Sequence, residues 1–385
     1  MSKKTKLLPL LIAPFVLTSC GQVTKYVDHL EDYVFTMQYH KNFNILQLTD
    51  IHWNINSSTY ESKNYMDKLL NEADAHVKAT QGANAKIDLV ELTGDMFMLS
   101  NSFEVRDFIN FFEKKSEELG FKYAAIWGNH DRHGLYHPKW LADQFRNAKN
   151  CYYYEPEDDL YGRSNFMINL TEDGTKNTEV KWQIANLDSG ASFSESPMSP
   201  FRDYDYIRKD QTAWWVAEHN AAGLDVPGIA YYHIPQDENL KLYDTRTSYK
   251  NKFFKLEDFA DNGNEEYASD FLETAKGLNL RGAFMGHAHN VDWTVQWDNL
   301  IVGLGVKTGI ELYYAHIDIN TEDPRMREGL TAIAEAGITE NFDLIGASLV
   351  TITDEENNIE GKFDLEHFYF NERESSEDFK VWVKF

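Results

Sequence analysis

Five short polar motifs, each placed where an apolar run ends, constrain this chain more than any other feature. They are DIH at 50–52, GD at 94–95, GNHD at 128–131, His233, and GHAH at 286–289. Stretches with helical spacing separate the first three runs, which predicts a β-α-β-α-β order with right-handed crossovers and helices outside the sheet. Because the carboxyl ends of adjacent parallel strands meet at one edge of a sheet, we expect the motifs to converge there.

The remaining elements follow from apolar periodicity and from the turn residues that bound each run. Strands are expected at 43–49, 87–92, 123–127, 166–170, 180–187, 228–234, 280–285, 291–297, 300–304, 347–352 and 362–370. Helices are expected at 61–81, 103–119, 210–222 and 331–336. No internal repeat or low-complexity linker is found in the sequence. One domain of two packed sheets covered by helices, with insertions at about 235–278 and 311–343, is the simplest arrangement.

Composition excludes several classes of protein. Hydrophobic residues make up 42% of the 385 positions and aromatic residues 14%, which is typical of a globular protein. The net charge of −25, from 62 acidic and 37 basic residues, argues against non-specific nucleic-acid binding and against charge-driven docking on anionic lipid. A phosphate substrate is not excluded, because the field of a local metal site outweighs the distant average.

The N-terminus has the features of a targeting segment. Lysines at 3, 4 and 6 precede an apolar stretch at 7–17, which is too short to span a bilayer and contains two prolines. The stretch ends in Leu-Thr-Ser-Cys20, which resembles the lipobox of bacterial lipoproteins, where the cysteine carries a lipid. An ordinary secretory signal with a chance cysteine is the alternative.

The lipobox interpretation divides the chain into three parts. Residues 1–20 would be a signal peptide, residues 21–40 a tether, and residues 41–385 the folded domain. The protein would then lie outside the cytoplasm, bound to a bacterial membrane through lipid on Cys20. The other cysteine, Cys151, is expected to be a buried small hydrophobe.

The polar motifs supply a set of metal ligands. Carboxylate, amide and imidazole groups bind divalent metals, and a site with this many of them fits two ions side by side, as in phosphate-ester hydrolysis. The expected ligands are Asp50, His52, Asp95, Asn129, His233, His287 and His289, and His130 is a spare imidazole. Taken singly these signals are weak, since an internal histidine such as His233 is more often a core residue. The complete set carries the hypothesis.

Local spacing supports the same site. In DIH and HAH the ligands stand at i and i+2, which predicts side chains on one side of an extended chain. A glycine precedes Asp95, Asn129 and His287, where it would allow close backbone approach or a positive φ. Asp95 has the central place, from which its two oxygens could bridge two cations.

The order of these motifs resembles the calcineurin-like metallophosphoesterase superfamily over residues 43–310. The resemblance implies an α/β (α+β) fold, a four-layer αββα sandwich with two mixed β-sheets flanked by helices. It also implies that Asp50, His52, Asp95 and His289 hold one metal and that Asp95, Asn129, His233 and His287 hold the other. His130 would stabilise or protonate the departing alkoxide, with Asp131 orienting its ring.

The segments LDSG at 187–190, 204–215 and 228–238 resemble the purple-acid-phosphatase-like branch. That branch has a tyrosine ligand three residues after the GD aspartate, and this chain has Met98 there, which lessens the reason to expect ferric iron. Trp127 replaces the arginine that protein Ser/Thr phosphatases place before GNH, so phosphoprotein specificity loses support. The nitrogen and oxygen ligands suit Mn, Fe, Zn or Co.

The expected function is metal-dependent hydrolysis of phosphate mono- or diesters by a hydroxide activated at the two metals. Two alternatives stay open: a nucleotide or cyclic-nucleotide phosphodiesterase or nuclease using the same site, and a non-catalytic surface lipoprotein. A phosphate ester is the expected partner, besides the membrane, with no nucleic acid and no protein partner inferred. Asp188 is expected to fix its loop, and Tyr204, Tyr206, Trp214 and Trp215 to serve as packing or as a lid.

Overall fold

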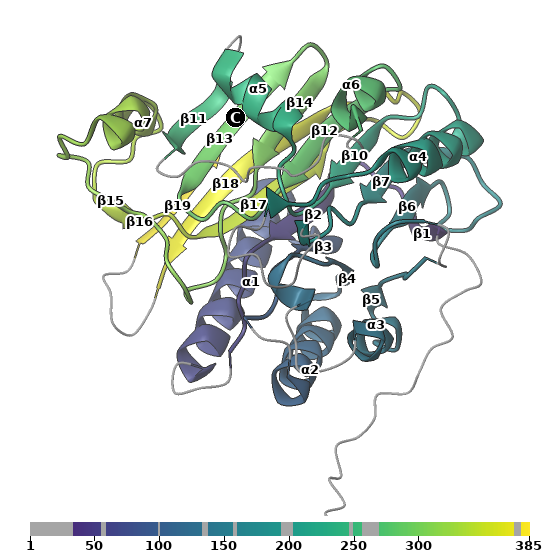
Figure 1. The fold of residues 1–385 in the computed structure, drawn as a ribbon, viewed down its shortest axis with the longest axis horizontal. Helices are drawn as coiled ribbons and strands as arrows, with labels where there is room; N and C mark the ends of the chain where they lie inside the picture. Colours follow the sequence, from purple (N-terminus) through teal and green to yellow (C-terminus); the bar gives the residue numbers. More distant parts are fainter. Residues whose placement is uncertain are drawn as a thin grey trace, which may run out of the picture.

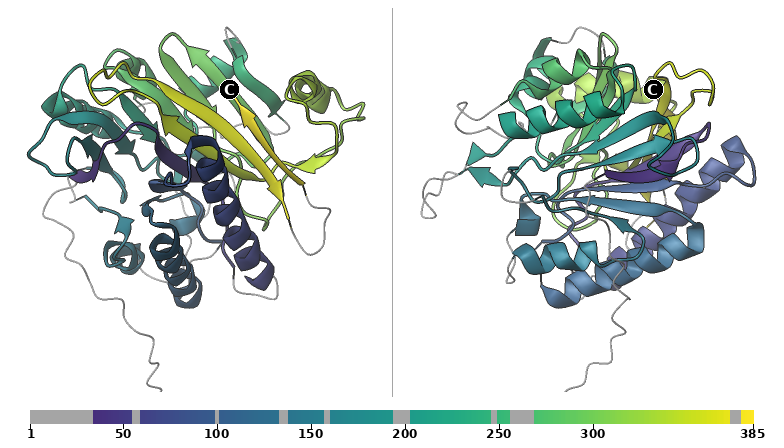
Figure 2. Two further views of the ribbon diagram at one scale, coloured as in Figure 1. Left: turned by 180° about the vertical axis from the view of Figure 1, so that it is seen from behind. Right: turned by 90° about the vertical axis from the view of Figure 1, so that its right-hand side faces the viewer.

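Two β-sheets packed face to face form the centre of the molecule, and helices cover both outer faces (Figure 1). The computed structural model describes residues 34–54, 59–98, 101–132, 138–156, 160–193, 203–245, 249–255, 269–372 and 379–385. The side view shows helix, sheet, sheet and helix as successive layers (Figure 2). The predicted four-layer αββα sandwich is confirmed.

The first sheet has eight strands and mixed direction. Its central strands β7, β10, β12 and β14 are parallel, whereas β6, β13 and β11 run antiparallel to their neighbours β7, β14 and β13. In spatial order the strands are β1 (Val34–Gln38), β6 (Phe166–Thr171), β7 (Val180–Asn186), β10 (Gly228–Tyr231), β12 (Leu280–Met285), β14 (Leu300–Leu304), β13 (Val291–Trp297) and β11 (Tyr249–Lys255).

The second sheet has seven strands and is also mixed. Strands β2, β3, β4 and β5 are parallel, and β17, β18 and β19 continue the sheet in antiparallel order on the other side of β2. In spatial order the strands are β19 (Phe379–Lys384), β18 (Phe363–Asn371), β17 (Gly346–Ile352), β2 (Phe43–Leu48), β3 (Leu89–Thr93), β4 (Lys122–Ile126) and β5 (Cys151–Tyr152).

Each sheet has its own helical layer. The helices α1 (Thr59–Gln81), α2 (Ser102–Leu119) and α3 (Pro138–Arg146) cover the seven-stranded sheet, and α4 (Lys209–Ala222), α5 (Asp237–Thr245) and α6 (Phe271–Lys276) lie over the eight-stranded sheet (Figures 1 and 2). A separate apolar cluster lies between the sheets, formed by residues such as Ile45, Leu89, Ile184 and Ile229.

Local sequence explains where these helices begin and end. The side chain of Asn101 accepts hydrogen bonds from the backbone N–H groups of Phe103 and Glu104, which caps α2. Gly120 ends α2 with φ 83°, a left-handed conformation that glycine adopts without strain. The apolar face of α2, including Phe108 and Phe112, is buried against the sheet.

Several elements differ from the predictions. Residues 34–38, predicted as part of the tether, form β1, which pairs in parallel with β6, so the sheet begins before residue 41. Strand β19 was not predicted. Helix α7 (Pro324–Glu335) begins earlier than expected, and it lies with the short strands β15 (His316–Ile317) and β16 (Phe342–Asp343) in the predicted 311–343 insertion. The predicted 235–278 insertion supplies α5, α6 and the edge strand β11.

Residues 1–33, including the predicted signal peptide and Cys20, lie outside the described residues. Within the part that the structure describes, no helix has the length and hydropathy needed to cross a membrane. Cys151 is fully buried, as predicted, in the core beneath α2 and α3.

Candidate metal centre

The five polar motifs lie at the carboxyl ends of neighbouring parallel strands. DIH follows β2, GD follows β3 and GNHD follows β4 in one sheet. In the other sheet, His233 follows β10 after one intervening residue and GHAH follows β12. All seven predicted ligands come together where these ends of the two sheets meet. Six are buried, with at most 5% of the residue exposed, and His287 is half-buried.

The backbone at these positions is unusual. Asp50, His52, Asp95 and His287 have φ of 52°, 50°, 50° and 75°, a region that non-glycine residues seldom adopt. The i and i+2 ligands therefore reach the site through left-handed turns. Our prediction that the alternation of an extended strand places these side chains on one side is wrong. The N–H groups of Asp50 and His52 donate to the carbonyls of Gly94 and Asp95 at 3.1 and 2.9 Å, which ties the two loops together.

The glycines of the motifs allow close approach, as predicted. A Cβ at Gly94 would lie 2.5 Å from the His233 ring, and one at Gly128 would lie 2.2 Å from Asp95 Oδ1. A Cβ at Gly286 would lie 1.9 Å from Thr49 Oγ1. Of these three, Gly94 also has a positive φ, of 91°. Each glycine thus makes room for a ligand loop that belongs to another strand.

The first ligand set consists of Asp50, His52 and His289. The Nε2 atoms of His52 and His289 face each other at 3.2 Å, and His289 Nε2 lies 3.3 Å from Asp50 Oδ1. His289 Nδ1 donates to the carbonyl of Tyr313 at 3.1 Å, which directs the Nε2 lone pair inward. Asp50 Oδ1 is buried and has no hydrogen-bond partner.

The second set consists of Asp95, His233 and His287, with the amide oxygen of Asn129 between the histidines. Asn129 Oδ1 lies 3.2 Å from His233 Nε2 and 2.9 Å from His287 Nδ1. His233 Nδ1 donates to the carbonyl of Thr93 at 2.9 Å, which again leaves Nε2 facing the other ligands.

Asp95 lies between the two sets. Its Oδ1 is 3.4 Å from His233 Nε2 in the second set, and its Oδ2 is 3.9 Å from His52 Nε2 in the first. One oxygen therefore faces each set, which is the arrangement a bridging carboxylate needs.

The charged groups of the site shift one another's pKa values. Burial alone would raise the pKa of the Asp50 carboxyl, but the nearby His233 and His289 hold it well below its usual range. Burial opposes a charge on His233, but Asp95 and Asp50 raise its pKa to about 9. Burial and the neighbouring cationic groups lower the pKa of His52 to about 3 and that of His287 to about 4.

The donor set fits two cations. Inward-facing imidazole lone pairs meet carboxylate and amide oxygens, so acceptors face acceptors unless a cation lies between them. A proton on His233 relieves part of this conflict, and two metal ions would relieve all of it. Metal binding would therefore displace a proton from His233.

His130 lies at the edge of the first set. Its ring centroid is 5.2 Å from that of His52, and its backbone N–H donates to Asp95 Oδ1 at 2.7 Å. Asp131 accepts from the N–H groups of Phe97 and Gly128 at 3.0 and 2.8 Å, so its carboxylate fixes the backbone around the GNHD turn. The roles predicted for the two side chains stay predictions.

One buried cation beside the site was not predicted. Lys307 Nζ donates to the carbonyls of Asp50 and Gly309, both at 2.9 Å, and burial lowers the pKa of Lys307 to about 8. The lysine supports the left-handed backbone of Asp50. Its sequence context, Gly-Val-Lys-Thr-Gly after an apolar strand, has no feature that distinguishes it from a surface loop.

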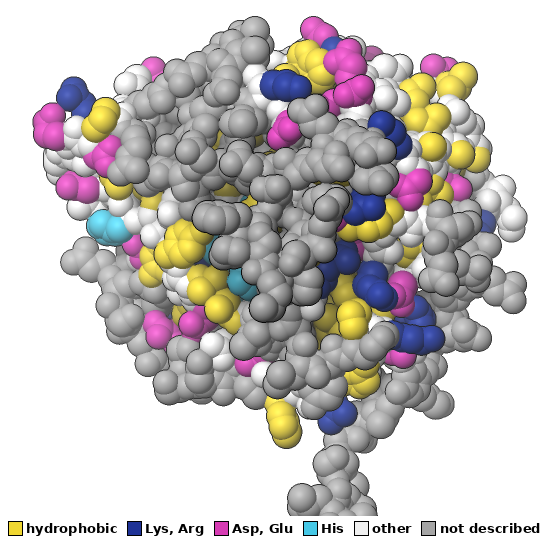
Figure 3. All heavy atoms as spheres, viewed as in Figure 1, with side chains coloured by type: hydrophobic (Ala, Val, Ile, Leu, Met, Phe, Trp, Pro, Cys, Tyr) yellow, Lys and Arg dark blue, Asp and Glu magenta, His cyan; other side chains and the backbone are white. Residues whose placement is uncertain are grey.

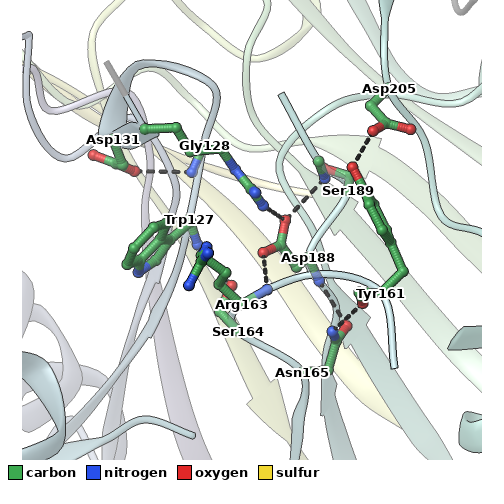
Figure 4. Close-up of polar contacts among 12 residues, drawn as sticks. Trp127, Gly128, Asp131, Tyr161, Arg163, Ser164, Asn165, Asp188, Ser189 and Asp205 are labelled. Carbon is green, nitrogen blue, oxygen red and sulfur yellow. Dashed lines mark hydrogen bonds and ion pairs between the residues drawn. The ribbon is translucent and has the colours of Figure 1, made fainter. Parts of the chain in front are cut away.

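A polar network links the GNHD loop to the other sheet (Figure 4). Arg132 forms an ion pair with the fully buried Asp188, whose oxygens also accept from the backbone N–H groups of Arg163 and Gly190. Asp188 therefore fixes its loop, as the sequence suggested. The same ion pair fixes the position of the Arg132 side chain.

Comparison with known proteins now defines the class. The sequence profile of the calcineurin-like phosphoesterases matches residues 43–291. The chain belongs to the calcineurin-like phosphoesterase family, and it is therefore a hydrolase that acts on phosphoric ester bonds.

The crystal structure of a dimetal phosphatase from Danio rerio is similar to this chain at 10% sequence identity, with a TM-score of 0.45, over 90% of this chain and 99% of that one. A search of the curated proteins found no match.

Proposed function

We propose that this protein is a phosphomonoesterase or phosphodiesterase that holds two metal ions in the centre described above. Membership of the family and the two facing ligand sets support metal-dependent hydrolysis. The observation that carries the dinuclear proposal is Asp95, because its two carboxylate oxygens face different ligand sets.

The proposed roles follow from position. A bound metal pair would polarise the phosphoryl group and acidify a water molecule. Asp50, His52, Asp95 and His289 would hold one ion, and Asp95, Asn129, His233 and His287 the other. The half-buried His130 imidazole, at the edge of the site, would donate a proton to the departing oxygen. Mn, Fe, Zn and Co all suit this donor set.

The test uses the full chain, purified in detergent and supplied with Mn²⁺. It should hydrolyse p-nitrophenyl phosphate or bis-p-nitrophenyl phosphate. Asp95→Ala should lose both activity and bound metal, whereas His130→Ala should lose rate about 10²-fold or more and keep its metal. His40→Ala is the matched control, because His40 precedes β2 at the opposite end of the sheet. Turnover of Asp95→Ala at the wild-type rate would end the proposal.

We further place the protein in the purple-acid-phosphatase-like branch, without that branch's tyrosine ligand. Met98 occupies the tyrosine position. Protein loaded with iron should therefore show no tyrosinate charge-transfer band in its visible spectrum, and a purple sample would contradict this assignment.

The lipobox supports a location outside the cytoplasm, anchored to a bacterial membrane through Cys20. Labelled palmitate should be incorporated into the full chain expressed in a bacterium and should be absent from Cys20→Ser. An unlabelled wild-type protein released in soluble form would indicate an ordinary secretory signal instead.

The substrate class is best decided by a panel. Nucleotides, cyclic nucleotides and DNA test the alternative of a nucleotide phosphodiesterase or nuclease. The net charge of −25 weighs against long polyanions, so we expect DNA to be the poorest of the three.

A further inference from the structure

An exposed apolar segment borders the metal centre beside the first ligand set. Four large hydrophobic side chains are exposed among the described residues: Phe103 at 72%, Leu224 at 64%, Tyr313 at 57% and Leu312 at 38%. Two of the four are adjacent in sequence, and the Tyr313 ring lies on the ring of the predicted ligand His289, with centroids 4.7 Å apart. Exposure of neighbouring large apolar groups is characteristic of binding surfaces.

Residues 308–313, which contain Leu312 and Tyr313, are hydrogen-bonded to two of the ligand loops. The N–H groups of Thr308 and Gly309 donate to the carbonyls of Thr49 and Asp50 at 2.8 and 3.2 Å. Further along, the Tyr313 carbonyl accepts from His289 Nδ1 at 3.1 Å. These bonds fix the position of the two exposed side chains relative to the site.

Leu312 has a strained backbone. Its φ is 61°, a conformation that is energetically costly for a bulky residue. Burial does not offset this cost well, because the side chain stays 38% exposed. Such strain commonly marks functional sites, where it holds a group in the place that a ligand needs.

An aromatic side chain also lies beside the second ligand set. The ring of Tyr204, in the short strand β9 (Asp203–Tyr204), lies 4.5 Å from the His287 ring at an angle of 74°. Aromatic rings thus flank both sets from different loops. On the face seen in Figure 3, histidine side chains reach the surface directly beside hydrophobic ones.

We propose that Tyr313 and Leu312 form a subsite for the alcohol part of the substrate, so that the enzyme prefers phosphate esters whose leaving alcohol carries an aromatic ring. The inference rests on the proposed phosphoesterase function. The ligand sets would hold the charged phosphoryl group, and the apolar rim would remove the aromatic face from water. An ester with a small alkyl alcohol would bind the same centre without this contribution.

The experiment compares benzyl and methyl esters of phosphate, which leave as alcohols of similar acidity, in whichever ester class the full-length enzyme hydrolyses. We expect kcat/KM to favour the benzyl ester by about tenfold or more in the wild type. Tyr313→Ala and Leu312→Ala should each lower the benzyl-to-methyl ratio severalfold. Leu224→Ala is the matched control, because Leu224 is as exposed but precedes β10, at the far end of that strand from His233. It should leave the ratio unchanged.

The outcomes separate the two proposals. A wild type that hydrolyses neither ester with metal bound contradicts the proposed function itself. A wild type active on both esters, with the same ratio in all three variants, overturns the apolar subsite alone. Metal content of Tyr313→Ala is measured in parallel. Leu312→Ala leaves in place the Tyr313 ring and carbonyl that contact His289, so its effect on the ratio separates the subsite from loss of metal.

Discussion

At the scale of single residues, the candidate metal centre contains backbone conformations with positive φ, which non-glycine residues seldom adopt. Four of the seven predicted ligands have positive φ. Each such residue costs roughly 1–3 kcal/mol, which the hydrogen bonds between the ligand loops must offset. Glycines beside these residues are therefore required for space as much as for conformation.

Gly94→Ala tests this requirement. The new Cβ would lie 2.5 Å from the His233 ring, so we expect loss of metal and a clear loss of stability, about 2 kcal/mol or more. Gly82→Ala is the matched control, since Gly82 has φ 111° and nothing within 4 Å of the added Cβ. Equal urea-unfolding free energies for the two variants would show that backbone strain alone sets the cost.

Glu91 gives a prediction about pH. It is fully buried between the sheets, neither carboxyl oxygen has a hydrogen-bond partner, and burial raises its pKa from 4.5 to about 8. The folded protein therefore keeps this carboxyl protonated while the unfolded chain releases the proton above pH 4.5. The stability contribution of Glu91 falls as pH rises from 4.5 to 8, by about 1.4 kcal/mol for each pH unit.

Glu91→Gln removes this dependence. We expect the variant to be more stable than the wild type by about 4 kcal/mol at pH 7.5 and by less than about 1 kcal/mol at pH 5, measured by urea unfolding. The exposed control Glu179→Gln should change stability by less than about 0.5 kcal/mol at both pH values. A Glu91→Gln difference that is the same at both would show that Glu91 is ionised in the folded state.

At the scale of elements, an ion pair between the half-buried Arg132 and the fully buried Asp188 connects the loops that follow β4 and β7. Asp188→Asn would leave the half-buried Arg132 guanidinium without this counter-ion, and we expect a loss of about 3 kcal/mol in the free energy of unfolding. Adding Arg132→Met should recover part of this loss. Glu117→Gln, in the exposed pair with Lys149, should cost less than about 1 kcal/mol. Additive effects of Asp188→Asn and Arg132→Met would disprove the coupling.

Most elements were predictable because their apolar periodicity is strong and local. The strand at 280–285 and the hairpin of 291–297 and 300–304 were predicted with the bounds that the structure shows. Strand β1 was missed because residues 21–40 were assigned to a tether after the lipobox, and because the pairing partner of β1, strand β6, lies far along the chain. An edge strand of this kind is set by tertiary contacts more than by its own residues.

The candidate site was predictable to the extent that its residues form recognisable motifs at strand ends. All seven predicted ligands meet in the structure, although the left-handed turns that bring Asp50 and His52 inward were not foreseen. Lys307 and Tyr313 were missed, because a single lysine or tyrosine in a loop has no pattern. Only the structure shows that Lys307 bonds to the carbonyl of Asp50 and that the Tyr313 ring contacts the ring of His289.

At the scale of the whole molecule, the ligands come from both sheets. Asp50, His52, Asp95 and Asn129 follow strands of the seven-stranded sheet, and His233, His287 and His289 follow strands of the other. Bound metal would therefore connect the two halves of the sandwich in the folded state and would have no equivalent site in the unfolded chain.

Metal should accordingly stabilise the fold. At free Mn²⁺ of about 100 times its Kd, we expect a gain of about 2.7 kcal/mol in the free energy of unfolding for each bound ion, reversed by a chelator. Thermal unfolding at increasing Mn²⁺ measures this gain. Asp95→Ala should show no dependence of Tm on Mn²⁺, and a wild-type Tm that is equally insensitive would place the metals elsewhere.

The separation of the ligands along the chain also sets when the centre can assemble. His52 and His289 face each other across 237 residues of sequence. A nascent chain that leaves the ribosome with its N-terminus first lacks His289 of the first ligand set and His287 of the second until GHAH has been synthesised. Binding of metal by the proposed centre would thus be a late event in the synthesis of this protein, because every shorter translation intermediate lacks a ligand of each set.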